Sequence, residues 1–152
     1  MTEDDAVTEF KEGLALLRNN YAHKALPHFT HARELDKANP FYLSYMGLAL
    51  AAAERNWDKA EEFCYQAVQM KRIQPELYIN LAEVYRLAGK RQDAIETLSQ
   101  GLQMTKQDAR IAEMLRRYGF RRPPVIPFLD RDHFLNRKLG RLRYRVLRSL
   151  GR

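Results

Sequence analysis

Residues 75–108, PELYINLAEVYRLAGKRQDAIETLSQGLQMTKQD, have the pattern of two amphipathic helices joined by a short turn at residues 88–90. Apolar side chains recur at helical spacing in the first half, at Tyr78, Leu81, Ala82 and Tyr85. They recur in the second half at Ala94, Leu98, Gly101 and Leu102. This spacing places them on one side of each helix, and the small residues among them allow close helix contact. One such hairpin cannot bury its apolar stripe alone, so the segment predicts neighbours of the same kind.

Two earlier parts of the chain repeat this pattern. Three columns of the second helices recur at steps of 35 and 34 residues: Ala25, Ala60 and Ala94; Phe29, Cys64 and Leu98; Ala32, Ala67 and Gly101. Two columns of the first helices recur at steps of 34 and 35 residues: Gly13, Gly47 and Ala82; Leu16, Leu50 and Tyr85. The extra residue therefore lies between Leu50 and Ala60, in a turn, where an insertion leaves both helix faces in register.

The columns divide the chain into units. We expect a disordered leader at 1–5 and helix-turn-helix repeats at 6–39, 40–74 and 75–108. Pro40 and Pro75 open the second and third repeats, where a helix has no backbone donor to lose. Residues 109–118 continue the apolar pattern, but Arg116 stands in the column of Gly13, Gly47 and Ala82. Because a partner helix cannot dock closely over an arginine, this segment is predicted to be a single capping helix.

The pattern resembles the tetratricopeptide repeat family, whose repeat is 34 residues of helix–turn–helix with small and aromatic signature positions. The resemblance covers roughly residues 6–118 and is strongest in the third repeat. It implies an all-α fold, a right-handed α-solenoid of three repeats with a capping helix and a proline-rich and basic helical C-terminal tail. It also implies a concave groove, formed by the first helix of each repeat, in which peptides bind. The groove residues it implies are Phe10, Leu14, Leu17, Phe41, Ser44, Tyr45, Leu48, Ile79, Glu83 and Arg86.

This predicted groove is apolar at one end and polar at the other. The alternative is that some of its residues only pack between repeats. The family's carboxylate-clamp subgroup holds chaperone tails with Lys and Asn at these positions, where this sequence has Phe10, Leu14, Phe41 and Ile79, with only Asn80 as a partial match. The chain therefore does not fit that subgroup. An apolar groove is more similar to that of secretion-type chaperones of the family, although their sequences lack an arginine-rich tail.

The end of the chain differs in charge from the repeats. Residues 1–115 hold 14 Lys/Arg and 17 Asp/Glu, a net charge of −3, whereas residues 116–152 hold 12 Lys/Arg and 2 Asp/Glu, a net charge of +10. Three prolines favour an extended path for 119–129, which could also occupy the groove in cis. Residues 130–152 have the pattern of a basic amphipathic helix, which could pack on protein, on an anionic membrane or on nucleic acid. Its basic residues include Arg137, Lys138, Arg141, Arg145 and Arg148.

Motifs for catalysis or cofactor binding are not found. The sequence has no glycine-rich phosphate loop and no serine in a nucleophile-elbow context. His28 and His31 stand at i and i+3 and could share a metal ion, but the sequence places no cysteine or carboxylate beside them as a further ligand. Cys64, the single cysteine, occupies an apolar column and is interpreted as a buried small hydrophobe. We therefore expect no enzyme activity, no cofactor and no metal.

The sequence predicts a non-enzymatic protein–protein interaction module, an adaptor, scaffold or chaperone that binds a peptide segment of a partner protein in the groove. The alternative is a peripheral tether that uses the arginine-rich helix on anionic membrane or nucleic acid. The acidic N-terminus has no apolar stretch typical of a signal peptide. We expect a cytoplasmic location, membrane-peripheral if the tail binds lipid. The partner and the oligomeric state stay open.

Overall fold

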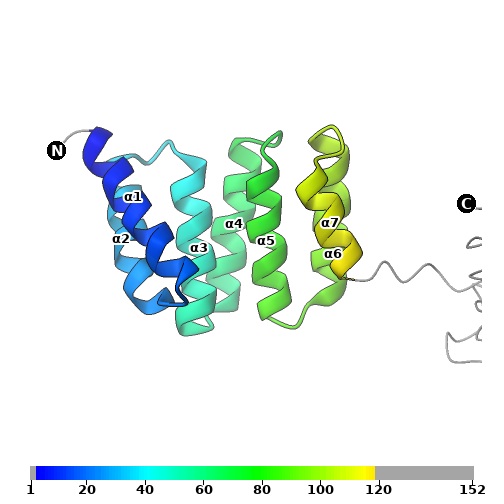
Figure 1. Ribbon diagram of the computed structural model, residues 1–152, viewed down its shortest axis with the longest axis horizontal. Coiled ribbons are helices and arrows are strands. Elements are labelled where there is room, and N and C mark those ends of the chain that lie inside the picture. Colours follow the sequence, from blue (N-terminus) through cyan, green and yellow to red (C-terminus); the bar gives the residue numbers. More distant parts are fainter. Residues whose placement is uncertain (1–2, 119–152) are drawn as a thin grey trace, which may run out of the picture. The chain divides into compact units, whose positions relative to one another are not determined.

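Residues 3–118 of the computed structural model are described, and this part of the chain consists of seven α-helices without a strand. The helices are α1 (Glu3–Arg18), α2 (Ala22–Leu35), α3 (Pro40–Glu54), α4 (Trp57–Met70), α5 (Pro75–Leu87), α6 (Arg91–Met104) and α7 (Ala109–Arg117). Figure 1 shows them in order from α1 to α7. The predicted all-α class is confirmed over these residues. Segments 119–129 and 130–152, with Arg137, Lys138, Arg141, Arg145 and Arg148, lie outside the described residues.

The first helix is longer than the sequence pattern predicted. Helix α1 begins at Glu3, so the prediction of a disordered leader is wrong for residues 3–5. The acidic side chains of Asp4 and Asp5 stand in the first turn, where negative charge interacts favourably with the helix dipole. The Thr8 hydroxyl donates to the carbonyl of Asp4 at 2.9 Å. Acidic composition near a helix N-terminus is therefore compatible with helix and does not by itself indicate disorder.

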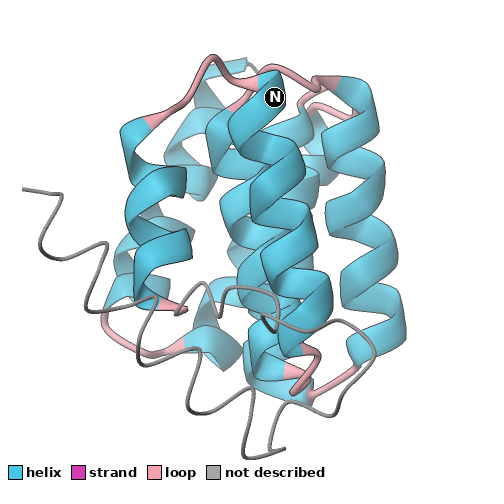
Figure 2. Cartoon of the chain, turned by 90° about the vertical axis from the view of Figure 1, so that its right-hand side faces the viewer, coloured by secondary structure: helices cyan, strands magenta, loops and turns pink. Residues whose placement is uncertain are grey.

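The helices form antiparallel pairs, α1 with α2, α3 with α4 and α5 with α6, and α7 packs on the last pair. Figure 2 shows the helices running alongside one another, with the connecting turns gathered at their two ends. Pro40 and Pro75 are the first residues of α3 and α5, as their fixed φ angle favours. The Asn39 side chain accepts from the backbone N–H of Phe41 at 3.0 Å, and Asp108 accepts from that of Arg110 at 2.9 Å. Each cap fixes where a helix begins.

Small residues mark the places where the helices cross. Ala25, Ala60 and Ala94 each hold the fourth position of the second helix of a pair, and all three are buried. At Gly47, a Cβ atom would lie 2.8 Å from the Cys64 sulfur and 2.9 Å from the Ala60 carbonyl oxygen. Contacts this short leave no room for a side chain at the crossing of α3 and α4. The repeat columns are thus crossing points, as ridge-into-groove packing requires.

Helix α3 lies at the centre of the stack. It contacts α2, α4 and α5 and has buried residues around most of its circumference, namely Tyr42, Leu43, Ser44, Gly47, Ala49, Leu50 and Ala51. A helix that is apolar on all sides is a buried helix. On the side of the first pair, Tyr42 and Tyr45 of α3 form an aromatic cluster with Phe10 of α1 and Phe29 of α2. The ring centroids in contact are 4.9 to 5.7 Å apart. Towards the C-terminus the core contains Leu77, Tyr78, Val84, Leu98 and Ile111.

Candidate peptide-binding surface

The candidate site is the surface formed by α1, α3, α5 and α7, which we call the first-helix face. Successive members of this set are in contact: Phe10 of α1 meets Tyr42 and Tyr45 of α3, while α3 contacts α5 and α5 contacts α7. Five predicted groove residues are apolar and only partly buried, so part of each side chain stays exposed. They are Leu14 and Leu17 in α1, Phe41 and Leu48 in α3, and Ile79 in α5.

Three of the predicted groove residues serve the packing instead. Ser44 is fully buried, and its hydroxyl accepts a hydrogen bond from the side-chain amide of Asn80 at 3.1 Å. The prediction that Ser44 lines the groove is corrected, because α3 is covered by α5 at this point. Phe10 and Tyr45 belong to the aromatic cluster between the first two pairs. Their rings set the distance between α1 and α3, and the partly buried leucines beside them keep part of their apolar surface exposed.

The C-terminal half of the first-helix face is a network of charged residues. The Tyr45 hydroxyl donates to Glu76 at 2.5 Å, and the other oxygen of Glu76 pairs with Arg110 at 2.7 Å. Glu83 pairs with Arg86 at 2.6 Å and accepts from the Tyr118 hydroxyl at 3.1 Å. Each glutamate of α5 thus connects its helix to a neighbour in the stack.

The two tyrosines of this network are held as neutral donors. Burial raises the pKa of Tyr45, and the hydrogen bond with Glu76 adds to the effect. Burial also raises the pKa of Tyr118 to about 12, with a further contribution from the negative charge of Glu83. A neutral phenol can donate to a carboxylate, whereas a phenolate would repel it. Both contacts are therefore stable at neutral pH.

Sequence reasoning missed Glu76, Arg110 and Tyr118, although a signal for two of them was available. Extending the repeat columns across the first helices gives Val7, Phe41, Glu76 and Arg110 in one column, and Leu14, Leu48, Glu83 and Arg117 in another. Both columns change from apolar in the first two pairs to acidic in α5 and basic in α7. Following both columns into residues 109–118 would have pointed to Glu76 and Arg110 as residues of the same surface. Tyr118 directly follows α7, and its place in the apolar pattern of residues 109–118 gives no sign of the hydrogen bond to Glu83.

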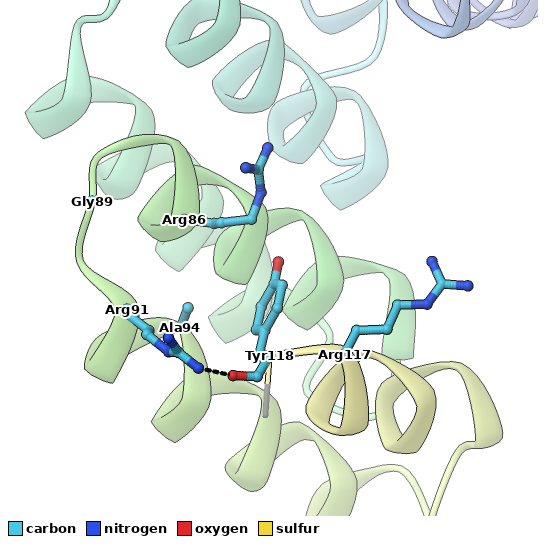
Figure 3. Close-up of a pocket in the computed structure, with 6 residues that line it drawn as sticks. All are labelled: Arg86, Gly89, Arg91, Ala94, Arg117 and Tyr118. Carbon is cyan, nitrogen blue, oxygen red and sulfur yellow. Dashed lines mark hydrogen bonds between the residues drawn. The ribbon is translucent and has the colours of Figure 1, made fainter. Parts of the chain in front are cut away.

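A hollow of about 260 Å³ lies at the C-terminal end of this network, and Figure 3 shows the residues around it. The lining residues are Arg86, Gly89, Arg91, Ala94, Arg117 and Tyr118. The Arg91 guanidinium donates to the backbone carbonyl of Tyr118, and Arg117 pairs with Glu113 at 3.2 Å. Three arginines thus line the hollow, and Figure 3 shows the side chain of Arg117 extending away from the other two.

The single cysteine is placed as its column predicted. Cys64 is fully buried, and its sulfur donates to the carbonyl of Ser44 at 3.2 Å. Burial raises the pKa of this thiol to about 12. Since the thiolate is the reactive form, Cys64 acts as a packing residue.

Carboxylates do stand beside the histidines of α2, contrary to the sequence interpretation. Glu9 of α1 lies 2.7 Å from His28 Nδ1 and 3.3 Å from His31 Nδ1, and Glu12 lies 3.5 Å from His28 Nδ1. The hydrogen bond with His28 lowers the pKa of Glu9. Spacing along the sequence cannot reveal this group, because the register of α1 against α2 joins residues 19 positions apart.

Comparisons with known proteins agree with this architecture. The tetratricopeptide repeat family model matches residues 51–118. None of the curated proteins compared with the chain matches its sequence. Among the residues that the structure describes, no helix has both the length and the apolar character needed to cross a membrane.

Several solved structures are similar in fold. The tetratricopeptide repeat domain of Sgt2 from Aspergillus fumigatus is 21% identical with a TM-score of 0.63. The match covers 74% of this chain and 76% of that chain. The second tetratricopeptide repeat domain of human RPAP3, in complex with the HSP70 peptide SGPTIEEVD, is 17% identical with a TM-score of 0.60. The match covers 75% of this chain and 94% of that chain. PcrH, in complex with the chaperone binding region of PopD, is 15% identical with a TM-score of 0.63, covering 78% and 89%. At these identities the likeness concerns the fold.

Proposed function

We propose that this chain, whose residues 51–118 match the tetratricopeptide repeat family model, is a non-enzymatic interaction module that binds a peptide segment of a partner protein along the first-helix face. Two structurally similar domains are complexes of this kind, human RPAP3 with an HSP70 peptide and PcrH with a region of PopD. Their low identity to this chain leaves the partner open. The residues of the face itself must therefore indicate what kind of segment fits.

The observation that carries the proposal is the change in chemistry along the two columns. Val7 and Leu14 of α1 and Phe41 and Leu48 of α3 offer apolar surface, and Val7 is exposed. Glu76 and Glu83 of α5, with Arg110 and Arg117 of α7, offer charge at the corresponding positions. A partner segment that fits has apolar side chains over α1 and α3, followed by polar or charged side chains over α5 and α7. Burial of the apolar part supplies affinity, and the charged part fixes the direction of binding.

The test begins with a peptide library displayed on phage and selected against the full chain. Selected peptides are synthesised, and their affinity is measured by fluorescence anisotropy for the wild type and for Leu14→Glu and Leu48→Glu. Each glutamate removes an apolar contact of about 1.5–3 kcal/mol, so the affinity should fall at least about 10-fold. Val7→Glu, at an exposed position, provides a variant with little risk of misfolding.

The matched control is Gln103→Glu, which adds the same charge at an exposed position of α6. It should bind like the wild type. Circular dichroism establishes that each variant keeps its helices. Equal binding by the wild type and all three α1 and α3 variants would reject the proposal.

The charge of the chain end favours a second candidate function. Residues 116–152 carry a net charge of +10, from 12 Lys/Arg against 2 Asp/Glu, which suits a tether on an anionic membrane or on nucleic acid. Binding of the full chain to phosphatidylserine vesicles or to duplex DNA should then fall steeply with salt. It should disappear when residues 130–152 are deleted. Salt-independent binding, or none, would dispose of the tether.

A further inference from the structure

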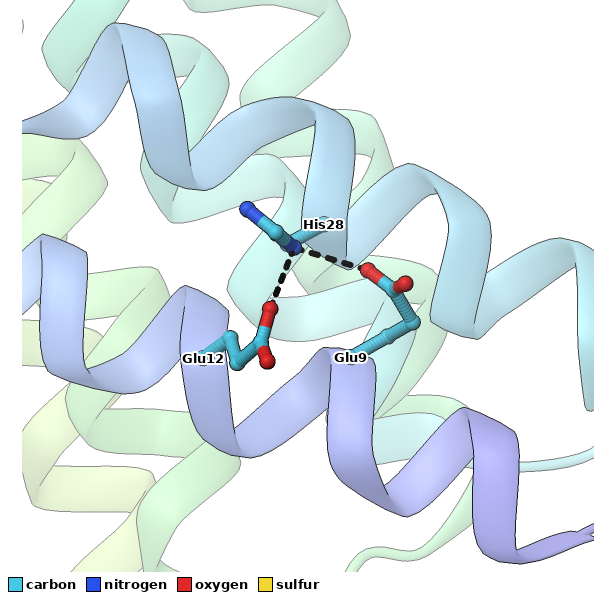
Figure 4. A group of neighbouring side chains, drawn as sticks. All are labelled: Glu9, Glu12 and His28. Carbon is cyan, nitrogen blue, oxygen red and sulfur yellow. Dashed lines mark hydrogen bonds and ion pairs between the residues drawn. The ribbon is translucent and has the colours of Figure 1, made fainter.

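Two helices bring three metal-ligating side chains together on the first pair, with a second histidine beside them. Glu9 and Glu12 extend from α1, and His28 and His31 extend from α2. Each of Glu9, Glu12 and His28 offers one donor atom, and these three atoms lie within 4.8 Å of one another. Figure 4 shows the two carboxylates turned towards the same ring nitrogen of His28, while its other ring nitrogen points away from them. His31 approaches from the next turn of α2, with its Nδ1 atom 3.3 Å from Glu9.

The distances suit a small divalent ion. Zinc binds imidazole nitrogen and carboxylate oxygen at about 2.0–2.2 Å, so the ligands of a tetrahedral ion stand about 3.3–3.5 Å apart. The separations from His28 Nδ1 are 2.7 Å to Glu9 and 3.5 Å to Glu12. Glutamate side chains rotate about three bonds, so their oxygens can adjust to the ligand separations of such an ion. The ion would replace the proton that His28 now shares with Glu9.

The charge of this group also favours a cation. Glu9 and Glu12 are neighbours on one helix at i and i+3, where like charges destabilise a helix. Within residues 3–118, the ion pairs of these two glutamates are made with His28 and His31, which are charged only when protonated. Neutral imidazoles would leave two adjacent carboxylates without a positive partner. A divalent ion supplies that charge and accepts both types of donor.

We propose that Glu9, Glu12 and His28 bind one divalent transition-metal ion of the zinc class, with water as the fourth ligand and His31 beside the site as a second partner of Glu9. The side chains are 27 to 58% exposed, so the ion enters from solvent and exchanges readily. Its effect is to tie α1 to α2. Because Leu14 and Leu17 follow this site on α1, the ion also steadies the apolar end of the first-helix face.

The test uses the full chain without a histidine tag, freed of metal with a chelator. Zn²⁺ is titrated by calorimetry, and Co²⁺ is added in parallel because its visible absorption reports a tetrahedral nitrogen and oxygen site. We expect one ion per chain and a rise in the thermal unfolding temperature on adding Zn²⁺. In Glu9→Gln and His28→Gln, the affinity should fall at least about 10-fold, and the rise should disappear.

Two controls separate this site from other histidines. His23 is exposed on the same helix, and His133 lies outside the described residues. His23→Gln and His133→Gln should bind one Zn²⁺ ion with wild-type affinity. Glu12→Gln, at the most exposed ligand, guards against loss of binding through misfolding. Absence of Zn²⁺ binding by the wild type, equal binding by all variants, or loss only in His133→Gln would overturn the proposal.

Discussion

The two ends of the helical stack are held together by different chemistry. Between the first and second pairs, Phe10 and Phe29 pack against Tyr45 with centroid distances of 5.3 and 5.6 Å. At the other end, the two glutamates of α5 make the polar contacts. Glu76 contacts Tyr45 of α3 and Arg110 of α7. Glu83 contacts Arg86 on its own helix and Tyr118 after α7. Burial of aromatic rings stabilises by several kcal/mol each, whereas partly exposed ion pairs contribute about 1 kcal/mol or less. Along the first-helix face, the contacts between α1 and α3 are therefore stronger than the polar contacts between α5 and α7, where Ile111 and Leu115 supply the buried apolar surface.

The largest expected effect comes from breaking the aromatic junction. Phe29 is fully buried and contacts both Phe10 and Tyr45, so Phe29→Ala should lower the free energy of unfolding by about 3–5 kcal/mol. Urea denaturation followed by circular dichroism measures this change. Tyr21→Ala, at an exposed aromatic position before α2, is the control and should have little effect. A loss below 1 kcal/mol at Phe29 would contradict the assigned strength of this junction.

A smaller effect is expected where two helices cross without room for a side chain. Gly47→Ala places a Cβ atom 2.9 Å from the Ala60 carbonyl oxygen, which is backbone and cannot move freely. We expect a loss of about 1–3 kcal/mol, although alanine is the better helix former by up to about 1 kcal/mol. Thermal and urea unfolding measure the balance. The third pair carries Ala82 in the same column. A stabilised Gly47→Ala variant would show that the crossing of α3 and α4 has room for a methyl group, as the crossing of α5 and α6 has at Ala82.

At the C-terminal junction, removing one hydroxyl should have an effect of about 1 kcal/mol. Tyr118→Phe deletes the hydrogen bond to Glu83, and the loss should be largest in the amide-exchange protection of α7. The pKa of Tyr118 is raised from 10.0 to about 12. Its contribution is therefore complete below about pH 10 and is lost as pH rises through about 12.

The pH dependence sharpens this prediction. The stability difference between the wild type and Tyr118→Phe should be constant at neutral pH and should shrink in the alkaline range. Tyr65→Phe, at an exposed tyrosine of α4, provides a control for the loss of one titrating phenol. A difference that grows with pH would mean that the hydroxyl of Tyr118 does not donate to Glu83.

The smallest effect is expected for the exposed ion pair between α5 and α7. The Arg110 side chain is 57% exposed, and its partner Glu76 is 29% exposed. Arg110→Ala should therefore cost about 0.5 kcal/mol, and high salt should reduce the difference further. Urea unfolding at low and high salt measures both quantities. A salt-independent loss of 2 kcal/mol or more would show that this pair is as important as the aromatic junction.

Much of the fold could be predicted from repetition alone. The columns through Ala25, Ala60 and Ala94 require only that similar residues recur at a fixed step, and Pro40 and Pro75 mark the helix starts directly. The start of α1 was less predictable, since Asp4 and Asp5 fit both a solvated leader and the first turn of a helix. The candidate surface was predicted in part. Leu14 and Leu48 are partly exposed, whereas Ser44 is buried.

The sequence by itself determined which residues share a helix and which side of that helix is apolar, because 3.6-residue periodicity is a local property. Only the tertiary structure decided which residues meet across helices. It buried Ser44 under α5, joined Glu76 to Arg110, and brought Glu9 to within 2.7 Å of His28. These contacts depend on the crossing and register of neighbouring helices, which the packing of all their side chains sets together. Periodicity along the chain therefore identifies the helices and their faces, while three-dimensional packing creates the polar clusters that could carry function.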